Sequence, residues 1–247
     1  MKGFDALVLA LVPEMLRKGL KRPIQIALSY DEEVGCLGAP SMIAAMRRAL
    51  PPAAAVLVGE PTELGVVTAH KGATGLETIV TGYTVHSSLV HRGVSAVMIA
   101  AELIQWHSAR MAENAAAADP ADPFDPPYTT LHCGKIEGGT ARNLVASECR
   151  FVTDFRVLPG ESVEAWVEKY RAFCDGVADR MRVTHPATGI EVKQGHVLPG
   201  CKPEQDGAAE TLARQLIGDN AVRVVSYGTE AGQFQDGGYS ACIIGPG

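Results

Sequence analysis

Acidic side chains follow two apolar runs of the sequence, at the places where strands are predicted to end. Glu32 and Glu33 come directly after residues 24–30, and Glu60 comes soon after residues 53–58. Side chains at the carboxyl ends of neighbouring strands meet in one crevice of an open α/β sheet. One carboxylate there could bind a metal ion while its neighbour moves a proton. The spacing therefore indicates half of a metal site.

The same acidic residues have a simpler interpretation as a solvated loop, which is what most Asp-Glu-Glu triplets are. Gly35 favours the first interpretation, because a turn at glycine would let Glu32 and Glu33 face one crevice. Pro61 would fix the turn after Glu60. From these residues alone the two interpretations stay balanced, since no histidine has a metal-like spacing to the carboxylates.

The histidines and cysteines near these runs are predicted to be structural. His70 lies near Glu60 in the sequence, but Lys71-Gly72 follows it at a predicted hinge. Cys36 lies close to Glu33 and could be a soft ligand, although a small buried filler is the commoner role. The six cysteines form no Cys-x-x-Cys pair, which indicates reduced thiols and a cytoplasmic location.

Composition argues against several classes of protein. The net charge of −6 and the lack of a basic run argue against nucleic acid and anionic membranes as partners. No apolar stretch of the sequence is long enough to span a membrane. Residues 1–12 faintly resemble a signal peptide, but Asp5 and Glu14 interrupt the pattern, so we interpret the segment as a buried amphipathic helix.

Helix and strand patterns alternate at the start of the chain, which predicts a mostly parallel α/β sheet with helices on its faces. The predicted helices cover residues 4–17 and 39–50, and the predicted strands cover residues 24–30, 55–58 and 65–70. The same style returns after residue 199. There the pattern predicts a helix at 207–216 and strands at 221–225 and 241–244.

A different pattern separates these two stretches. Strands are predicted at residues 76–83, 129–136, 149–157 and 190–197, and helices at 94–118 and 162–181. The order β-α-β-β-α-β is that of a ferredoxin-like α+β unit. Such an insertion suggests a lid or dimerisation domain at residues 71–198. Residues 1–70 and 199–247 would then form one α/β domain.

Several motifs resemble the family of dinuclear-zinc amidohydrolases that includes acetylornithine deacetylases, succinyl-diaminopimelate desuccinylases, aminoacylases and glutamate carboxypeptidases. They follow the family's order along the whole chain, and residues 227–235 are most similar to the acetylornithine deacetylases. The other motifs are residues 1–3, 29–39, 59–62, 81–88, 138–143, 154–156 and 159–160. The resemblance implies an incomplete three-layer catalytic domain of the zinc-exopeptidase type, with an inserted ferredoxin-like lid and dimerisation domain.

The resemblance also implies roles for matching residues. Glu32 would be the general base. Glu33 and Glu60 would each bind one of two divalent metal ions, zinc or cobalt. His86 would donate to the oxyanion of the tetrahedral intermediate. In this family that histidine reaches the active site of the other subunit, so we expect a homodimer formed through the lid.

Five more residues are candidates for binding an N-acyl amino acid substrate. Asn143 could donate from its amide and Arg156 could form a fork with a substrate carboxylate. A turn and an ordinary salt bridge are the simpler roles for these two. Glu230 would suit the amine of an ornithine side chain, with Thr229 and Gly232 in the same polar loop. A helix cap would explain Glu230 equally well.

The family's bridging aspartate would precede residue 1, and its metal-binding histidines would lie beyond either end of the chain. We therefore expect a fragment of the enzyme. The expected reaction of the complete enzyme is hydrolysis of N-acetyl-L-ornithine to ornithine and acetate, in arginine biosynthesis. A second hypothesis is a sister activity: desuccinylase, aminoacylase or dipeptidase. A third is a non-catalytic remnant whose lid domain still dimerises.

Overall fold

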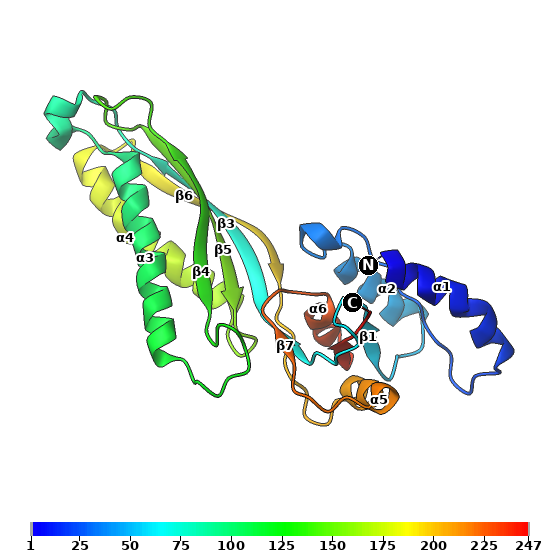
Figure 1. Cartoon of the computed structure of the whole chain (residues 1–247). Helices are drawn as coiled ribbons and strands as arrows, with labels where there is room; N and C mark the ends of the chain where they lie inside the picture. Colours follow the sequence, from blue (N-terminus) through cyan, green and yellow to red (C-terminus); the bar gives the residue numbers. More distant parts are fainter. Residues whose placement is uncertain (1, 247) are drawn as a thin grey trace. The chain divides into compact units, whose positions relative to one another are not determined.

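The computed structural model describes residues 2–246 of the 247-residue chain, and these fall into two compact units (Figure 1). Unit 1 consists of Met1–Gly72, Pro123–Asp125 and Leu198–Gly247, and unit 2 consists of Ala73–Asp122 and Pro126–Val197. Each unit has hydrophobic cores of its own. Met1, which begins the first family motif, lies outside the described residues.

Unit 1 is an α/β arrangement with two short parallel strand pairs. β1 (Val56–Val58) pairs with β8 (Ala241–Ile243), and β2 (Ala69–His70) pairs with β7 (Val224–Val225). The predicted strands at 65–70 and 221–225 therefore form only at their last residues. The helices of this unit are α1 (Lys2–Arg17), α2 (Ala39–Ala49), α5 (Ala208–Ile217) and α6 (Ala231–Asp236). Among these, α6 is not predicted by the sequence pattern.

The larger core of unit 1 lies between α2, α6 and the β1–β8 pair. Ile43 of α2, Phe234 of α6 and Ile243 of β8 are almost completely buried in it. A smaller cluster packs Ala209 and Ala213 of α5 against neighbouring apolar residues. Burial of this apolar surface fixes the strand β1, and with it the chain that follows β1.

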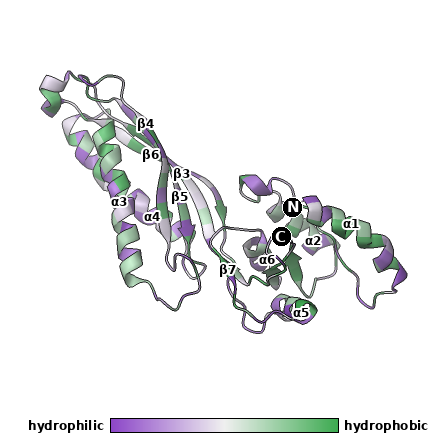
Figure 2. Cartoon of the chain, in the orientation of Figure 1, coloured by the Kyte–Doolittle hydropathy of each residue, from purple (hydrophilic) through white to green (hydrophobic). Residues whose placement is uncertain are grey.

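The start of unit 1 leaves many apolar side chains exposed. α1 forms where the helical periodicity predicts it, but its predicted burial is wrong, because none of its residues is buried. The helix is hydrophobic along most of its length (Figure 2). The strand predicted at residues 24–30 does not form, because the segment has no ladder partner among the described residues. That prediction was wrong, since alternating apolar residues make a strand only where a second strand accepts and donates hydrogen bonds.

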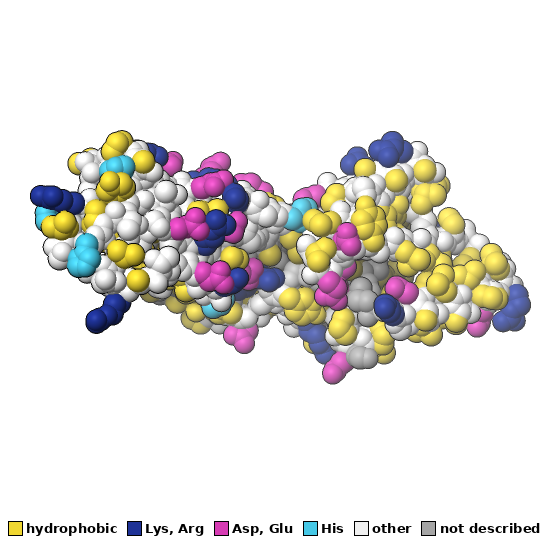
Figure 3. All heavy atoms as spheres, turned by 90° about the horizontal axis from the view of Figure 1, so that it is seen from above, with side chains coloured by type: hydrophobic (Ala, Val, Ile, Leu, Met, Phe, Trp, Pro, Cys, Tyr) yellow, Lys and Arg dark blue, Asp and Glu magenta, His cyan; other side chains and the backbone are white. Residues whose placement is uncertain are grey.

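Residues 23–28 instead lie along one side of α2. Together with Met42, Met46 and Leu50 they line an open, mostly apolar hollow of about 630 Å³. The Gln25 side-chain amide donates a hydrogen bond to the Pro51 carbonyl at 2.8 Å. The segment is therefore held by side-chain contacts, and hydrophobic side chains gather on the surface at this end of the unit (Figure 3).

Unit 2 is a four-stranded sheet with two long helices, and it confirms the predicted ferredoxin-like insertion. The sheet order is β4-β5-β3-β6, in which β4 and β5 are antiparallel. None of the helices in the described part of the chain is both long and apolar enough to cross a membrane. The elements are β3 (Gly72–Thr81), α3 (Ala96–Ala117), β4 (Thr130–Gly138), β5 (Glu148–Val157), α4 (Val163–Thr184) and β6 (Gly189–Leu198).

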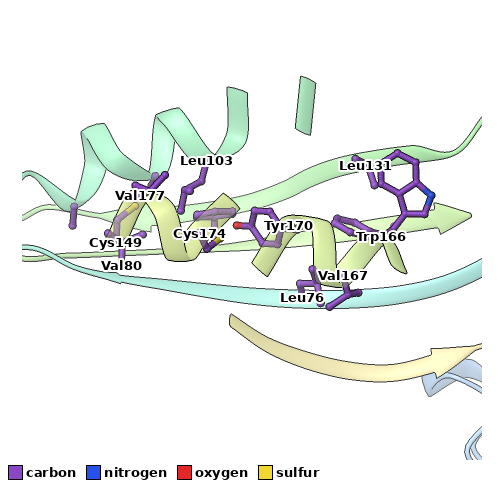
Figure 4. Close-up of a cluster of buried hydrophobic side chains, with 14 of the residues drawn as sticks. Leu76, Val80, Leu103, Leu131, Cys149, Trp166, Val167, Tyr170, Cys174 and Val177 are labelled. Carbon is purple, nitrogen blue, oxygen red and sulfur yellow. The ribbon is translucent and has the colours of Figure 1, made fainter. Parts of the chain in front are cut away.

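The core of unit 2 lies between the two helices and one face of the sheet (Figure 4). Leu76 of β3, Leu103 of α3 and Tyr170 of α4 are almost completely buried there. The Tyr170 hydroxyl forms a hydrogen bond of 2.9 Å with the Thr78 hydroxyl, so its polar atom is satisfied inside the core. At the start of α4 the Ser162 hydroxyl accepts a hydrogen bond from the Ala165 N–H and so caps the predicted helix.

The exposed face of the sheet carries ion pairs between residues two positions apart, which share a face of a strand. Figure 3 shows acidic and basic side chains intermingled on this unit. Exposed pairs of this kind contribute little to stability, so the face is a solvated surface. The pairs are Glu148–Arg150 and Asp154–Arg156 on β5, Lys135–Glu137 on β4 and Glu191–Lys193 on β6.

His107 of α3 is a titratable group enclosed by the aromatic core of unit 2. Only 1% of the residue is exposed, and its ring centroid lies 4.5 Å from that of Tyr170. Neither ring nitrogen makes a well-formed hydrogen bond with another described residue. Burial lowers the pKa of His107 from 6.5 to about 4, because the imidazolium ion would lose its hydration. The folded unit therefore holds this histidine neutral.

We predict that unit 2 loses stability as the pH falls from 6.5 toward about 4. In this range the unfolded chain binds a proton that folded His107 does not, so the free energy of unfolding decreases with decreasing pH. The lowered pKa corresponds to a decrease of about 3 kcal/mol in the free energy of unfolding over this pH range. Trp106 and Trp166, the two tryptophans of the chain, both lie in unit 2. Their fluorescence during urea unfolding measures this pH dependence.

Replacing His107→Phe should flatten the pH dependence, because the replacement cannot bind a proton. His132→Phe is the matched control, since His132 is an exposed histidine on β4 of the same unit. The control protein should keep the slope of the original chain. A slope that survives in the His107→Phe protein would show that another group causes it.

Candidate functional site

The first predicted carboxylates lie on a tight turn in unit 1. Glu32–Val34 form a 3₁₀ turn, η1, and Gly35 ends it with a φ of 112°. The backbone N–H groups of Gly35 and Cys36 both donate to the Glu32 carbonyl, at 3.0 and 2.9 Å. Any other residue would be strained at Gly35, so the glycine permits the predicted turn. The turn leaves Glu32 half-buried and Glu33 exposed, which gives the two carboxylates different surroundings.

Glu60 follows β1, at the place where the sequence predicts a second strand-end carboxylate. The residue is half-buried. Burial, together with repulsion from Glu32 and Glu230, raises the pKa of Glu60 from 4.5 to about 7. Glu32 and Glu230 are therefore the acidic groups that act most strongly on Glu60. We call these three residues, Glu32, Glu60 and Glu230, the acidic cluster.

Glu230 is the most buried member of the acidic cluster, with 8% of its surface exposed. Its Oε1 atom has no hydrogen-bond partner among the described residues. Burial raises the pKa of Glu230, a hydrogen bond from Ser29 opposes this shift, and Glu32 adds to it. Glu230 precedes α6 but makes no capping hydrogen bond. The Thr229 hydroxyl caps the helix instead, because it accepts a hydrogen bond from the Ala231 N–H at 3.2 Å.

Cys36 is buried beside the acidic cluster. Its thiol donates a weak hydrogen bond to Glu32 Oε1 at 3.7 Å. Burial first, and then repulsion from Glu32 and Glu230, raise the pKa of Cys36 to about 12. Its burial and its contact with Glu32 are those of a small buried residue, which is the commoner role of a free cysteine.

The acidic cluster suits a cation but does not form a complete metal site. Three neighbouring carboxylates repel one another, and a bound cation would relieve that repulsion. Within residues 2–246, however, no group of three histidine, cysteine, aspartate or glutamate side chains is arranged to hold a metal ion. Zinc sites normally have three or four protein ligands. The described residues therefore do not fit a zinc ion on their own.

His70, which the sequence suggests is structural, fixes the start of α6 beside the acidic cluster. It is completely buried, and burial lowers its pKa to about 4, so the ring is neutral near pH 7. Its Nε2 atom accepts a hydrogen bond from the Gly232 N–H at 3.3 Å, and its Nδ1–H donates to the Lys71 carbonyl at 2.9 Å. A side chain at residue 232 would collide with the Pro199 carbonyl, so the close approach requires glycine.

In unit 2 the structure brings His86 and Asn143 together. The 3₁₀ segment η2 (Ser87–Arg92) begins after His86, and the loop that follows β4 runs alongside it. The Ser87 N–H donates to the Asn143 carbonyl at 2.9 Å, and His86 forms an antiparallel bridge with Leu144. Both His86 and Asn143 are exposed. Their side chains are therefore accessible at this end of the unit.

Arg156 lies at the other end of the β4–β5 hairpin. It pairs with Thr130, whereas Gly138, next to the loop of Asn143, pairs with Cys149. At roughly 3.3 Å per residue, the strand from Cys149 to Arg156 spans about 23 Å. Arg156 Nε donates to the Asp154 carboxylate at 2.7 Å, which is the ordinary salt bridge considered above. Within unit 2, Arg156 is thus separate from His86.

We predict that Glu32→Gln lowers the pKa of both Glu60 and Cys36, because Glu32 is the largest electrostatic contributor to each shift. NMR titration of the Glu60 Cδ and Cys36 Cβ signals measures the two values. Glu33→Gln is the matched control, since Glu33 is exposed and contributes less to Glu60. Equal effects of the two replacements would contradict the geometry of the acidic cluster.

Known proteins resemble this chain over its whole length. The peptidase dimerisation domain of the M20 type matches residues 68–182. The chain is 32% identical to an acetylornithine deacetylase from Myxococcus xanthus over 246 residues, and 30% identical to one from Salmonella typhimurium over 247 residues. It spans 62% of the length of each of these relatives.

Solved structures share the fold. The aminopeptidase PepT from Bacillus cereus superposes with a TM-score of 0.63 at 23% identity, over 87% of this chain and 53% of that one. A tripeptidase from Staphylococcus aureus gives 0.62 at 21% identity, with the same coverage. These structures confirm the predicted fold class, and at such identities they carry no more than the fold. Residues 68–182 thus match the M20 peptidase dimerisation domain, and the whole chain is similar to acetylornithine deacetylases over 62% of their length.

Proposed function

We propose that the protein hydrolyses the amide bond of an N-acyl amino acid, and that this substrate is N-acetyl-L-ornithine, an intermediate of arginine biosynthesis. The observation that supports this most is the whole-chain similarity to acetylornithine deacetylases. In the reaction, a water oxygen bonds to the amide carbon, and the carbon–nitrogen bond then breaks. Ornithine leaves as the amine and acetate is the second product.

Glu32 is the proposed general base. It is half-buried on the η1 turn, where two backbone hydrogen bonds to its carbonyl hold the residue in place. A carboxylate there would take a proton from the attacking water and later pass it to the leaving nitrogen. The leaving nitrogen needs this proton because an amide anion is a very poor leaving group.

His86 and Asn143 are the proposed hydrogen-bond donors to the oxygen that gains negative charge. The pairing of their backbones would keep the two donors at a fixed separation, which is what stabilisation of an oxyanion requires. We also propose that the protein is a homodimer formed through unit 2, in which His86 serves the active site of the other subunit. The matched dimerisation domain supports this arrangement.

The remaining candidates would bind the substrate. The buried Oε1 atom of Glu230, which lacks a partner among the described residues, would accept a hydrogen bond from the amine of the ornithine side chain. Thr229 and Gly232 would line the same position at the start of α6. Arg156 would bind the substrate carboxylate, and it would have to exchange its contact with Asp154 for that purpose.

Two divalent metal ions, zinc or cobalt, are proposed as cofactors, with Glu33 and Glu60 among their ligands. The raised pKa of Glu60 supports a cationic ligand at the acidic cluster. Because the described residues do not complete a metal site, further groups would have to contribute. The domain assignment is likewise proposed: residues 1–70 and 199–247 form the catalytic domain of a cytoplasmic enzyme, and residues 71–198 form its lid.

We predict that the protein releases acetate from N-acetyl-L-ornithine when Zn²⁺ or Co²⁺ is present, and that Glu32→Gln lowers kcat by roughly 10²- to 10⁴-fold. Glu63→Gln is the control, because it removes an exposed carboxylate from the segment after β1. Faster release from N-succinyl-diaminopimelate or from an N-acyl amino acid without a side-chain amine would reveal a sister activity. A lack of turnover with all of these substrates would refute the proposed hydrolysis for this chain and would support the third hypothesis, a non-catalytic chain whose lid domain dimerises.

A further inference from the structure

The ring of His86 is held on one edge by the residue two positions later. Its Nδ1 atom accepts a hydrogen bond from the Ser88 backbone N–H at 3.2 Å and lies 2.9 Å from the Ser88 hydroxyl oxygen. His86 thereby caps η2, in the way that a serine or aspartate side chain caps a helix. No hydrogen bond from a described residue reaches Nε2, on the other edge of the exposed ring.

This contact favours a proton on one of the two ring nitrogens of His86. A backbone N–H can only donate, so the 3.2 Å contact forms when Nδ1 presents its lone pair, and this biases the neutral ring toward a proton on Nε2 without fixing it there alone. The Ser88 hydroxyl can rotate to donate to the same lone pair, and this favours the same tautomer. Ser88 therefore supplies two donors to Nδ1 and leaves Nε2–H as the free donor.

The backbone around His86 is fixed independently of Ser88. The Ser87 N–H is bound to the Asn143 carbonyl. Before His86, the ring of Tyr83 stacks on that of His185 with 3.5 Å between centroids and an interplanar angle of 10°. Loss of the Ser88 hydroxyl should therefore change the state of the ring without displacing the chain that carries it.

We propose that Ser88 is a positioning residue, which holds neutral His86 in the Nε2–H tautomer and so keeps an N–H donor available to a substrate oxygen. The use of that donor rests on the proposed function. The tautomer itself is a property of this chain that can be measured without any substrate. A serine that served only as a solvated turn residue would not affect it.

The experiment is ¹⁵N NMR of the labelled chain at a pH where His86 is neutral, because the nitrogen chemical shifts distinguish the two tautomers. His86→Asn identifies the signals of this ring among the seven histidines. Ser88→Ala removes the hydroxyl and keeps the backbone N–H. Ser88→Asp replaces a donor with an acceptor. Ser87→Ala is the matched control, since Ser87 contributes a backbone contact.

We expect the Nε2–H tautomer in the original chain and in Ser87→Ala. The Ser88→Ala chain should show a mixture of tautomers, and the Ser88→Asp chain should show mainly Nδ1–H. Two results would overturn the proposal. One is Nδ1–H as the main tautomer of the original chain, and the other is an unchanged tautomer in the Ser88→Ala chain.

In the deacetylase assay, Ser88→Ala should lower kcat about fivefold, the equivalent of one hydrogen bond, and leave KM unchanged. Ser87→Ala should change neither constant. A chain with the Nε2–H tautomer but without deacetylase activity would refute the proposed function and leave this inference intact. An active chain whose His86 carries the proton on Nδ1 would refute this inference and leave the proposed function intact.

Discussion

Burial of acidic side chains is the constraint that shapes the candidate site of unit 1. Glu60 and Glu230 have raised pKa values first because they are buried and then because Glu32 repels them, so the folded chain holds these groups at a cost in stability. The η1 turn, the β1–β8 pair and the hydrogen bond of His70 to Gly232 keep them there. A local loss of stability that a rigid framework holds in place is typical of a site that binds a ligand of opposite charge.

The architecture of unit 2 could be predicted from the sequence because local patterns determine its elements. β5 alternates buried and exposed residues, and Ser162 marks the start of α4. Residues 24–30 show similar alternation, but a strand also needs a partner, which one segment cannot reveal. The six residues of α6 are too few for a helical period, and the contact that fixes their start comes from His70, 162 residues earlier than Gly232.

The candidate site also has parts that the sequence predicts and parts that depend on contacts between distant segments. Glu32 and Glu60 could be found because each follows an apolar run, and Gly35 correctly signals the turn. The separation of Arg156 from Asn143 depends on the register of the β4–β5 hairpin, which the motifs alone do not determine. The contact of Ser88 with His86 spans two residues and belongs to a known capping geometry, so the His-Ser-Ser spacing was a signal for it.

The irregular segment at residues 24–30 has a consequence for how the chain behaves in concentrated solution. It contains no charged residue, its apolar side chains alternate, and no strand of the described chain covers its edge. Segments of this composition recruit copies of themselves into intermolecular β-structure. In unit 2 the edge strands β4 and β6 carry the charged pairs Lys135–Glu137 and Glu191–Lys193, which oppose this route. Aggregation of the chain would therefore begin at its amino-terminal end, and a single lysine in place of Ile26 would act as a gatekeeper against it.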